Sequence, residues 1–474
     1  MTENIFIGKG LEKEKIIDIE VNLPLKTLNL HGMVGGSTGT GKSRAIQVIV
    51  EKLAEQGIPV LLGDLKGDIS GFAFPNNSEK ALERAKKMKL SYTPEGFETN
   101  YWSVSQRFVP FRLRLSDIDP VLISRILKLN STQESNLRIS YLYAKAKDIA
   151  LTDLIDLKNL LEFIAKTPGA IEGAHASSIN IILRQVKIAI GEGMNEFFGE
   201  PAVQIEDLMQ GINVINLSDW RRRSDILAIL MSFVIYRLFN ELPDVGDVSK
   251  PKLIVFIDEA HYLFQDANPN LVNLIITILK QIRSKGVGVF FSSQNPEDIP
   301  EKILEQLGCK IEFALRAFTK NELADIRGIA NAFPPSEEYD LEKEIPMLGN
   351  GIAFVSALDE TGRPFNPVKT MIAPPRSFMD VASDEQVKSK INQTLLSKYY
   401  EKTEWRRTEF VGGPAIRKLP LERRTYWDES TRQNIAHDKK VTRQVNQSWN
   451  RLKWVAIFLL FILLVVIIIV LLIK

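Results

Sequence analysis

One segment of eight residues limits the fold of this 474-residue chain more than any other feature. It has the pattern G-x-x-x-x-G-K-[ST], and it lies between an apolar stretch at 28–34 and a stretch with helical apolar spacing at 43–56. A strand, a glycine-rich loop and a helix in this order are typical of a phosphate-binding loop, because the loop amides and the helix N-terminus both attract phosphate oxygens. The loop residues are Gly36, Ser37, Thr38, Gly39, Thr40, Gly41, Lys42 and Ser43.

The last two loop residues predict ATP and Mg²⁺ as ligands. Lys42 is expected to reach the β- and γ-phosphates, and the Ser43 hydroxyl is expected to bind Mg²⁺. The alternative is a chance turn rich in Gly, Ser and Thr. The flanking strand and helix patterns favour nucleotide binding.

A second apolar stretch, 253–257, is followed by Asp258 and Glu259. The pattern predicts a buried parallel strand with two carboxylates at its carboxyl end, where open α/β sheets bind ligands. We expect Asp258 to hold Mg²⁺ through water and Glu259 to be the general base for hydrolysis. Acidic residues also start ordinary helices, but beside a phosphate loop hydrolysis is the better interpretation.

A third apolar strand is expected at 286–293, and it ends at Gln294. The amide of Gln294 could sense the γ-phosphate or orient water, or it could belong to an ordinary loop. Arg283 precedes this strand, and its nearness in the chain to Gln294 is expected to place it at the edge of the nucleotide site. It fits an arginine finger that crosses a subunit boundary, and it equally fits a solvated charge at a helix C-terminus. The residues alone leave both alternatives open.

These segments together resemble the HerA/FtsK-like ATPases, which are ring-forming motors that move DNA. The chain is most similar to the stand-alone HerA-like branch that includes YjgR-like proteins. The resemblance covers roughly residues 5 to 375 and implies an α/β fold, with a RecA-like P-loop NTPase core and a mostly parallel sheet. The segments that carry it are 36–43, 257–261 and 283–296, with 63–71, 197–201 and 314–319 for the branch.

The resemblance also implies site roles and partners. Lys42, Ser43, Asp258, Glu259 and Gln294 take the roles given above. Arg283 matches the trans-acting arginine finger of the family, and Arg316 is a weaker second arginine candidate. DNA and a homo-oligomeric ring are the implied partners. HerA motors carry an N-terminal β-barrel, for which the residues before Gly36 leave no room.

The core is expected at 1–375, with a helical insertion at about 80–210. Apolar residues three and four apart predict helices in the insertion. Five basic residues there could line a nucleic-acid surface or belong to solvated helix faces; they are Arg138, Lys145, Lys147, Arg184 and Lys187. Asp64, Lys66 and Asp68 follow another expected strand, and both a helix cap and a part of the site fit them.

The C-terminal part has a different composition. Residues 376–453 are a polar connector, and its part from 401 has 13 Lys and Arg against 7 Asp and Glu. Residues 454–473 contain no charge and are long enough, at about 30 Å, to cross a membrane as a helix. Lys and Arg before this segment predict a C-terminal anchor with the ATPase domain in the cytoplasm.

The predicted function is that of a membrane-tethered ATPase motor that acts on DNA as a ring. The alternative is a nucleotide-gated membrane switch or assembly ATPase without a nucleic-acid substrate, which the net charge of only +2 allows. Residues 258–261 also spell a DEAH box. That helicase class needs a second motor fold, for which 286–375 is too short.

Overall fold

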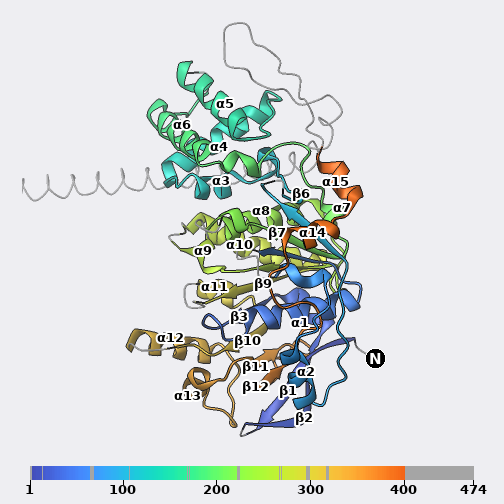
Figure 1. Cartoon of the computed structure of the whole chain (residues 1–474). Coiled ribbons are helices and arrows are strands. Elements are labelled where there is room, and N and C mark those ends of the chain that lie inside the picture. The colour runs from blue at the N-terminus through green and yellow to red at the C-terminus, as the bar shows by residue number, and fades with distance from the viewer. Residues whose placement is uncertain are drawn as a thin grey trace, which may run out of the picture.

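The computed structural model describes residues 3–400 except 13, 65–68, 106, 168, 170, 221–224, 266, 268, 295–298 and 317–319. Twelve strands of this described part form a single sheet in the order β2-β1-β12-β11-β10-β3-β9-β8-β4-β7-β5-β6 (Figure 1). Neighbouring strands are parallel from β10 to β6 and antiparallel from β2 to β10. The sheet is therefore mostly parallel, as the sequence predicts.

The strands are β1 (Asn4–Glu12), β2 (Lys15–Pro24), β3 (Gly32–Gly35), β4 (Val60–Asp64), β5 (Thr99–Ser103), β6 (Val109–Pro110), β7 (Ile212–Asn216), β8 (Leu253–Ile257), β9 (Val287–Ser293), β10 (Cys309–Phe313), β11 (Ile352–Ala357) and β12 (Val368–Ile372). The strand expected at 28–34 begins later than predicted, because Leu25–Leu30 forms a 3₁₀-helix.

The helices are α1 (Lys42–Glu55), α2 (Glu79–Lys87), α3 (Pro120–Ile126), α4 (Ser131–Ala146), α5 (Leu154–Lys166), α6 (Ala176–Gly191), α7 (Ile205–Leu208), α8 (Asp225–Glu241), α9 (His261–Phe264), α10 (Pro269–Ile282), α11 (Glu301–Leu304), α12 (Lys320–Asn331), α13 (Leu341–Glu344), α14 (Asp384–Ser389) and α15 (Gln393–Tyr400).

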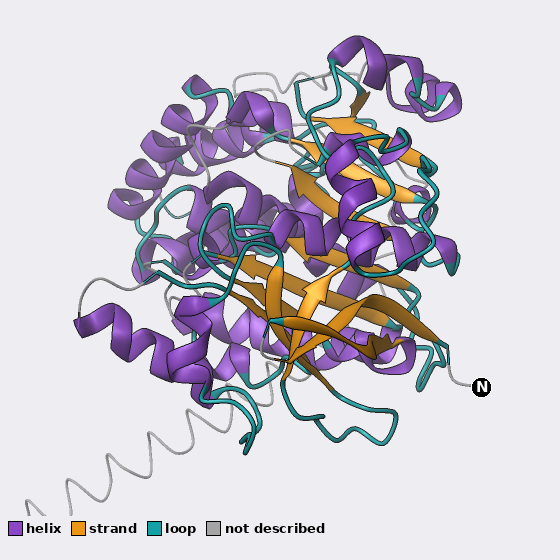
Figure 2. Ribbon diagram, turned by 60° about the horizontal axis from the view of Figure 1, so that its bottom comes forward, coloured by secondary structure: helices purple, strands orange, loops and turns teal. Residues whose placement is uncertain are grey.

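Helices cover both faces of the sheet (Figure 2). Successive residues of β8 alternate between two apolar clusters, with Val255 in one cluster and Ile254 and Phe256 in the other. The first cluster includes residues of α8 and α10, and the second includes residues of α1. Burial on both faces explains why β8 is a continuous apolar run.

The helical insertion consists of α3 to α6 and lies beside β5 and β6 at one end of the sheet, at the top of Figure 1. Its four helices were expected from apolar spacing and are confirmed. Strands β5 and β6 also fall inside the range of about 80–210, so the helical part starts only at Pro120. The sequence of β5, Thr-Asn-Tyr-Trp-Ser, lacks the apolar run by which the other core strands were recognised.

The packed chain continues beyond residue 375, where the connector was expected to start. Ser377, Val387 and Tyr399 are each at most 1% exposed. The Tyr399 ring packs on Trp102 of β5 at a centroid distance of 5.4 Å. Residues 376–400 therefore belong to the folded domain.

The expected anchor at 454–473 lies outside the described residues. Among the residues that are described, no helix combines the length and the apolar character that crossing a membrane requires.

Candidate active site

The carboxyl ends of four neighbouring strands bring the predicted site residues to one edge of the sheet. Strands β3, β9, β8 and β4 are adjacent and parallel. The phosphate loop follows β3, Gln294 follows β9, and Asp258 and Glu259 follow β8. Asp64 ends β4 and is 1% exposed, whereas Lys66 and Asp68 lie outside the described residues. Parallel strands thus collect residues that are more than 200 positions apart.

The phosphate loop has a backbone that requires glycine at two positions. Gly36 has a φ of 137° and Gly41 a φ of 125°. A Cβ atom on Gly36 would lie 2.6 Å from the Cβ of Phe313, so a side chain there would also clash. These positions explain the first and third glycines of the segment.

Backbone contacts hold the loop from two sides. On one side the Ser37 amide donates to the Ala314 carbonyl at 2.9 Å, and the Arg316 amide donates to the Ser37 hydroxyl at 3.1 Å. On the other side the Gly351 amide donates to the Thr40 carbonyl at 2.8 Å. Arg316 thus lies beside the phosphate loop of its own subunit.

The Lys42 ammonium lies on the phosphate loop itself. It donates to the carbonyls of Gly36, at 2.5 Å, and Ser37, at 3.2 Å. Lys42 is the first residue of α1, and Ser43 is the second. Both side chains therefore start from the N-terminal end of a helix, which is where a phosphate group is electrostatically favoured.

Gln294 joins the phosphate loop to the predicted general base. The Thr38 hydroxyl donates to Oε1 of Gln294, and Nε2 of Gln294 donates to Oε1 of Glu259. Because β9 lies between β3 and β8, a single side chain at its tip reaches both neighbours. Gly36–Ser43, Gln294 and Glu259 form one connected site.

The sequence as a whole was also compared with known proteins. A family model described as "Helicase HerA-like C-terminal" matches residues 10–411. The chain belongs to this family. This match confirms the resemblance to HerA/FtsK-like ATPases at the level of the family.

Curated relatives of the HerA-like family have low identity to the chain. The DNA import protein CedB of Sulfolobus acidocaldarius is 23% identical over 322 residues, which cover 65% of this chain and 47% of CedB. The DNA double-strand break repair helicase HerA of Sulfurisphaera tokodaii is 23% identical over 304 residues, which cover 62% and 57%. The chain spans about half the length of the curated relatives it matches.

Solved structures share the fold. The bacterial conjugative coupling protein TrwB superposes with a TM-score of 0.54 at 13% identity, over 81% of this chain and 97% of TrwB. VirB4 of Thermoanaerobacter pseudethanolicus superposes with a TM-score of 0.52 at 15% identity, over 78% and 96%. The α/β P-loop NTPase fold is therefore confirmed.

In this HerA-like chain Glu259 has an unusual backbone conformation. Its φ is 48°, which side chains other than glycine rarely adopt. Its side chain is buried, and Oε2 lies 3.5 Å from Nδ1 of His261. The same nitrogen of His261 lies 3.1 Å from the hydroxyl of Ser293. Strained, buried polar residues of this kind concentrate at functional sites.

The donors at this edge suit Mg²⁺. The Ser43 hydroxyl and the Asp258 carboxylate are hard oxygen ligands, and Mg²⁺ in nucleotide sites is held by one or two such groups together with phosphates and water. Within the described ranges no cluster of three His, Cys, Asp or Glu side chains could hold a metal by itself. The chemistry of these two oxygen donors fits Mg²⁺ that is also bound to a nucleotide.

Arg283 lies at the opposite edge of the sheet. It is exposed in the 3₁₀-turn Arg283–Lys285 before β9, and its carbonyl accepts from Nδ2 of Asn29 at 3.4 Å. Because Gln294 follows β9, the full length of the strand separates the two residues. The expectation that Arg283 lies at the edge of its own nucleotide site is wrong, and its role toward a neighbouring subunit stays a prediction.

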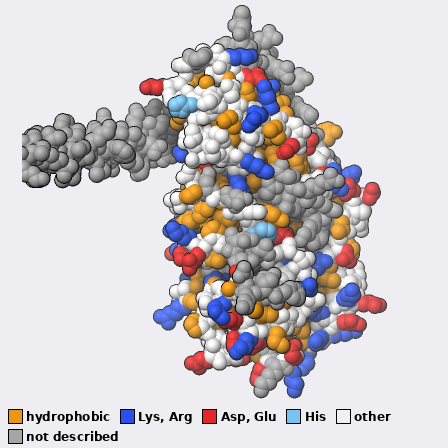
Figure 3. Space-filling view, turned by 90° about the vertical axis from the view of Figure 1, so that its left-hand side faces the viewer, with side chains coloured by type: hydrophobic (Ala, Val, Ile, Leu, Met, Phe, Trp, Pro, Cys, Tyr) orange, Lys and Arg blue, Asp and Glu red, His pale blue; other side chains and the backbone are white. Residues whose placement is uncertain are grey.

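The five basic residues of the helical insertion are all exposed. Lys187 pairs with Glu162 at 2.9 Å. On the face drawn in Figure 3, basic and acidic side chains are interspersed. Solvated helix faces and a nucleic-acid surface both remain compatible with this distribution.

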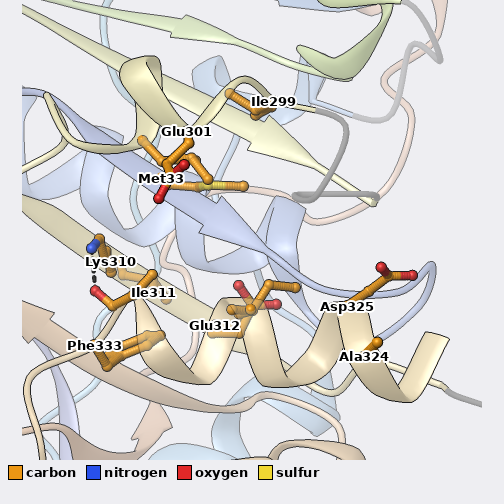
Figure 4. Close-up of a pocket in the computed structure, with 13 residues that line it drawn as sticks. Met33, Ile299, Glu301, Lys310, Ile311, Glu312, Ala324, Asp325 and Phe333 are labelled. Carbon is orange, nitrogen blue, oxygen red and sulfur yellow. Dashed lines mark hydrogen bonds between the residues drawn. The ribbon is translucent and has the colours of Figure 1, made fainter. Parts of the chain in front are cut away.

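A cavity of about 310 Å³ lies apart from the phosphate loop, between β3, β10 and α12 (Figure 4). Its lining is mainly apolar, with Ile311 and Phe333 among the residues, and Glu312 and Lys310 are polar members. The Lys310 ammonium donates to the Ala332 carbonyl. No residue of the phosphate loop lines this cavity.

Proposed function

We propose that this chain is an ATP hydrolase that works as a DNA-translocating motor. The observation that carries the proposal is the hydrogen-bonded path from Thr38 through Gln294 to Glu259. It joins a phosphate-binding loop to a buried carboxylate. That is the arrangement needed for a group that senses the γ-phosphate and a group that activates water.

Each residue has a distinct task in the proposed reaction. The loop amides and Lys42 bind the β- and γ-phosphates, and Glu259 accepts a proton from the attacking water. Gln294 already bonds to both sides of the site, so a γ-phosphate would compete for its amide. Loss of that phosphate would let Gln294 return to Glu259, which makes the amide a sensor of the nucleotide state.

Ser43 and Asp258 would hold Mg²⁺ at this site, Ser43 directly and Asp258 through water. Bound Mg²⁺ neutralises phosphate charge. TrwB has also been solved in complex with a non-hydrolysable ATP analogue, and that structure superposes on this chain with a TM-score of 0.52. The bound analogue supports a nucleotide as the ligand of the proposed site.

DNA is proposed as the substrate because of the relatives. Their names include a DNA import protein and a DNA double-strand break repair helicase. The exposed basic residues of α4 and α6 support this substrate, because contacts to phosphates supply most of the non-specific affinity for DNA.

A ring and a membrane tether complete the proposal. Arg283 is exposed on the far edge of the sheet, so a catalytic role for it would be on the site of another subunit, and such a role requires an assembly. The uncharged segment 454–473 is proposed as the membrane anchor because of its length and composition. After deletion of 451–474, the protein should no longer stay with membranes in a carbonate wash.

The test is ATP hydrolysis by the full-length chain with and without double-stranded DNA. We expect hydrolysis that DNA stimulates and that Lys42→Ala abolishes. Wild-type hydrolysis at the same rate with and without DNA would favour the nucleotide-gated switch. A wild-type rate no higher than that of Lys42→Ala would refute the proposed ATPase activity.

A further inference from the structure

The phosphate loop depends on a neighbour that no motif identifies. Gly351, just before β11, donates its amide to the Thr40 carbonyl at 2.8 Å. Its backbone also packs against the loop, since a Cβ atom on Gly41 would lie 3.1 Å from the Cα of Gly351. The position of Gly351 therefore sets the position of Thr40 and Gly41.

Arg84 of α2 in turn holds Gly351. Its Nη2 donates to the Gly351 carbonyl at 2.7 Å, and its Nε donates to the Ile372 carbonyl at 2.8 Å. The Ile372 amide donates to the same Gly351 carbonyl at 3.0 Å. One planar guanidinium thus joins the start of β11 to the end of β12.

Close packing makes this contact specific. Gly351 has a φ of 73°, and a Cβ atom there would lie 2.7 Å from Nη2 of Arg84. A side chain at Gly351 would displace the guanidinium, and a shorter side chain at Arg84 would leave the Gly351 carbonyl with one donor fewer. Either change loosens the backbone on which Thr40 rests.

We propose that Arg84 is a positioning residue for the bound nucleotide, acting through Gly351 on the amides of the phosphate loop. This inference rests on the proposed nucleotide site. Arg84 touches the loop only through Gly351, so it influences the diphosphate that the loop binds and not the group that is transferred. Its loss should weaken ATP and ADP binding by the same factor.

The experiment measures the Kd of Mg-ATP and Mg-ADP for the full-length chain by calorimetry. Arg84→Gln should raise both Kd values about tenfold, because a charge-assisted hydrogen bond behind the loop is lost. Arg84→Lys should give a smaller rise, since one ammonium cannot reach both carbonyls. At saturating ATP, kcat should stay within about twofold while KM rises with Kd.

Arg112 provides a matched control. It is buried, whereas Arg84 is half-buried, and it too donates to a distant carbonyl, that of Tyr399 at 3.2 Å. It lies at the other end of the sheet, next to β6. Arg112→Gln should lower the melting temperature to a similar degree and leave both Kd values unchanged. If Arg84→Gln lowers only the melting temperature, Arg84 is a structural residue and the inference is overturned.

A second variant covers the case in which Arg84→Gln fails to fold. Gly351→Ala keeps Arg84 but displaces its guanidinium, and it should raise the same two Kd values. Unchanged affinity in Gly351→Ala would also overturn the inference. A wild-type chain that binds neither nucleotide would instead overturn the proposed function, and this inference with it.

Discussion

Two polar side chains at opposite edges of the sheet, Gln294 and His31, differ in what they bond to. At the carboxyl edge of β9, Gln294 bonds to the side chains of Thr38 and Glu259. At the amino edge, both ring nitrogens of His31 bond to the main chain. Nε2 lies 2.8 Å from the Leu279 carbonyl, and Nδ1 accepts from the Val289 amide at 3.0 Å.

This difference separates exchangeable contacts from fixed ones. A bond between two side chains can be replaced by a bond to a ligand when one side chain rotates. A buried bond to the main chain cannot be exchanged without local unfolding, because the amide or carbonyl would be left unsatisfied. Gln294 at the carboxyl edge can thus respond to a ligand, whereas His31 holds the amino edge in place.

Among the tests of this difference between the two edges, Arg283→Ala is expected to have the largest effect. In an assembled ring, Arg283→Ala should lower ATP hydrolysis by ~10³-fold, because a guanidinium given to a neighbour stabilises charge in the transition state. Such a loss would give the amino edge a catalytic role on the next subunit. Full activity of assembled Arg283→Ala would leave that edge purely structural, with Arg316 as the next candidate.

A mixing experiment locates the Arg283 effect. Glu259→Gln and Arg283→Ala should each be almost inactive. Together they should regain activity, since some sites then combine an intact Glu259 with a neighbour's intact Arg283. A mixture that assembles but stays at background argues against action between subunits.

Glu259→Gln sharpens the assignment of the carboxyl edge. The amide keeps the size of the side chain and loses its basicity, so turnover should fall on the order of 10²-fold or more while ATP still binds. Single-turnover hydrolysis and a direct Kd measurement separate these effects. Equal turnover by the variant and the wild type would rule out Glu259 as the general base.

His31 tests the amino edge through pH. Burial, with a smaller effect from the Arg283 charge, lowers the pKa of His31 to about 4. The unfolded chain therefore binds a proton between pH 6.5 and 4 that the folded chain does not. Between pH 6.5 and 5 the free energy of unfolding should fall by about 1.5 kcal/mol more in the wild type than in His31→Gln.

The comparison with His31→Gln is necessary because Glu51 acts in the opposite direction. Burial raises the pKa of Glu51 to about 7, so its contribution to stability increases as the pH falls. That contribution is common to both chains and cancels in the difference. Parallel stability curves of the two chains would show that His31 does not titrate as expected.

Gln294→Ala should have the smallest effect. It removes the bridge but neither the phosphate loop nor the base, and we expect about a tenfold fall in kcat with little change in Kd. Gln294→Glu, which keeps the length of the side chain, is a useful comparison. An unchanged kcat in Gln294→Ala would mean that the bridge has no part in turnover.

The sequence predicted the parts of the site that depend on local patterns. The phosphate loop, the carboxylates after β8 and the amide after β9 each follow a recognisable apolar strand, and the common direction of the strands brings them together. The position of Arg283 was predicted wrongly. Arg283 precedes β9 and Gln294 follows it, so the two residues are near each other in the chain but lie at opposite ends of the strand.

Other site features depend on contacts that no local pattern encodes. Arg84 and Gly351 are 267 positions apart in the chain. Arg84 has the sequence surroundings of any basic residue on an exposed helix. The bridge through Gln294 likewise forms only when β3, β9 and β8 are side by side.

Residues 376–378, which the sequence placed in a loose connector, have a consequence for how the protein forms. The buried Glu51 on α1 accepts from the amides of Arg376 and Ser377, both at 2.8 Å, across 325 and 326 positions. During synthesis, nearly all of the described chain must be made before the Glu51 carboxylate on α1 can accept these two hydrogen bonds. Contacts of such long range slow folding, so the newly made chain passes through a stage in which these contacts to α1 have not yet formed.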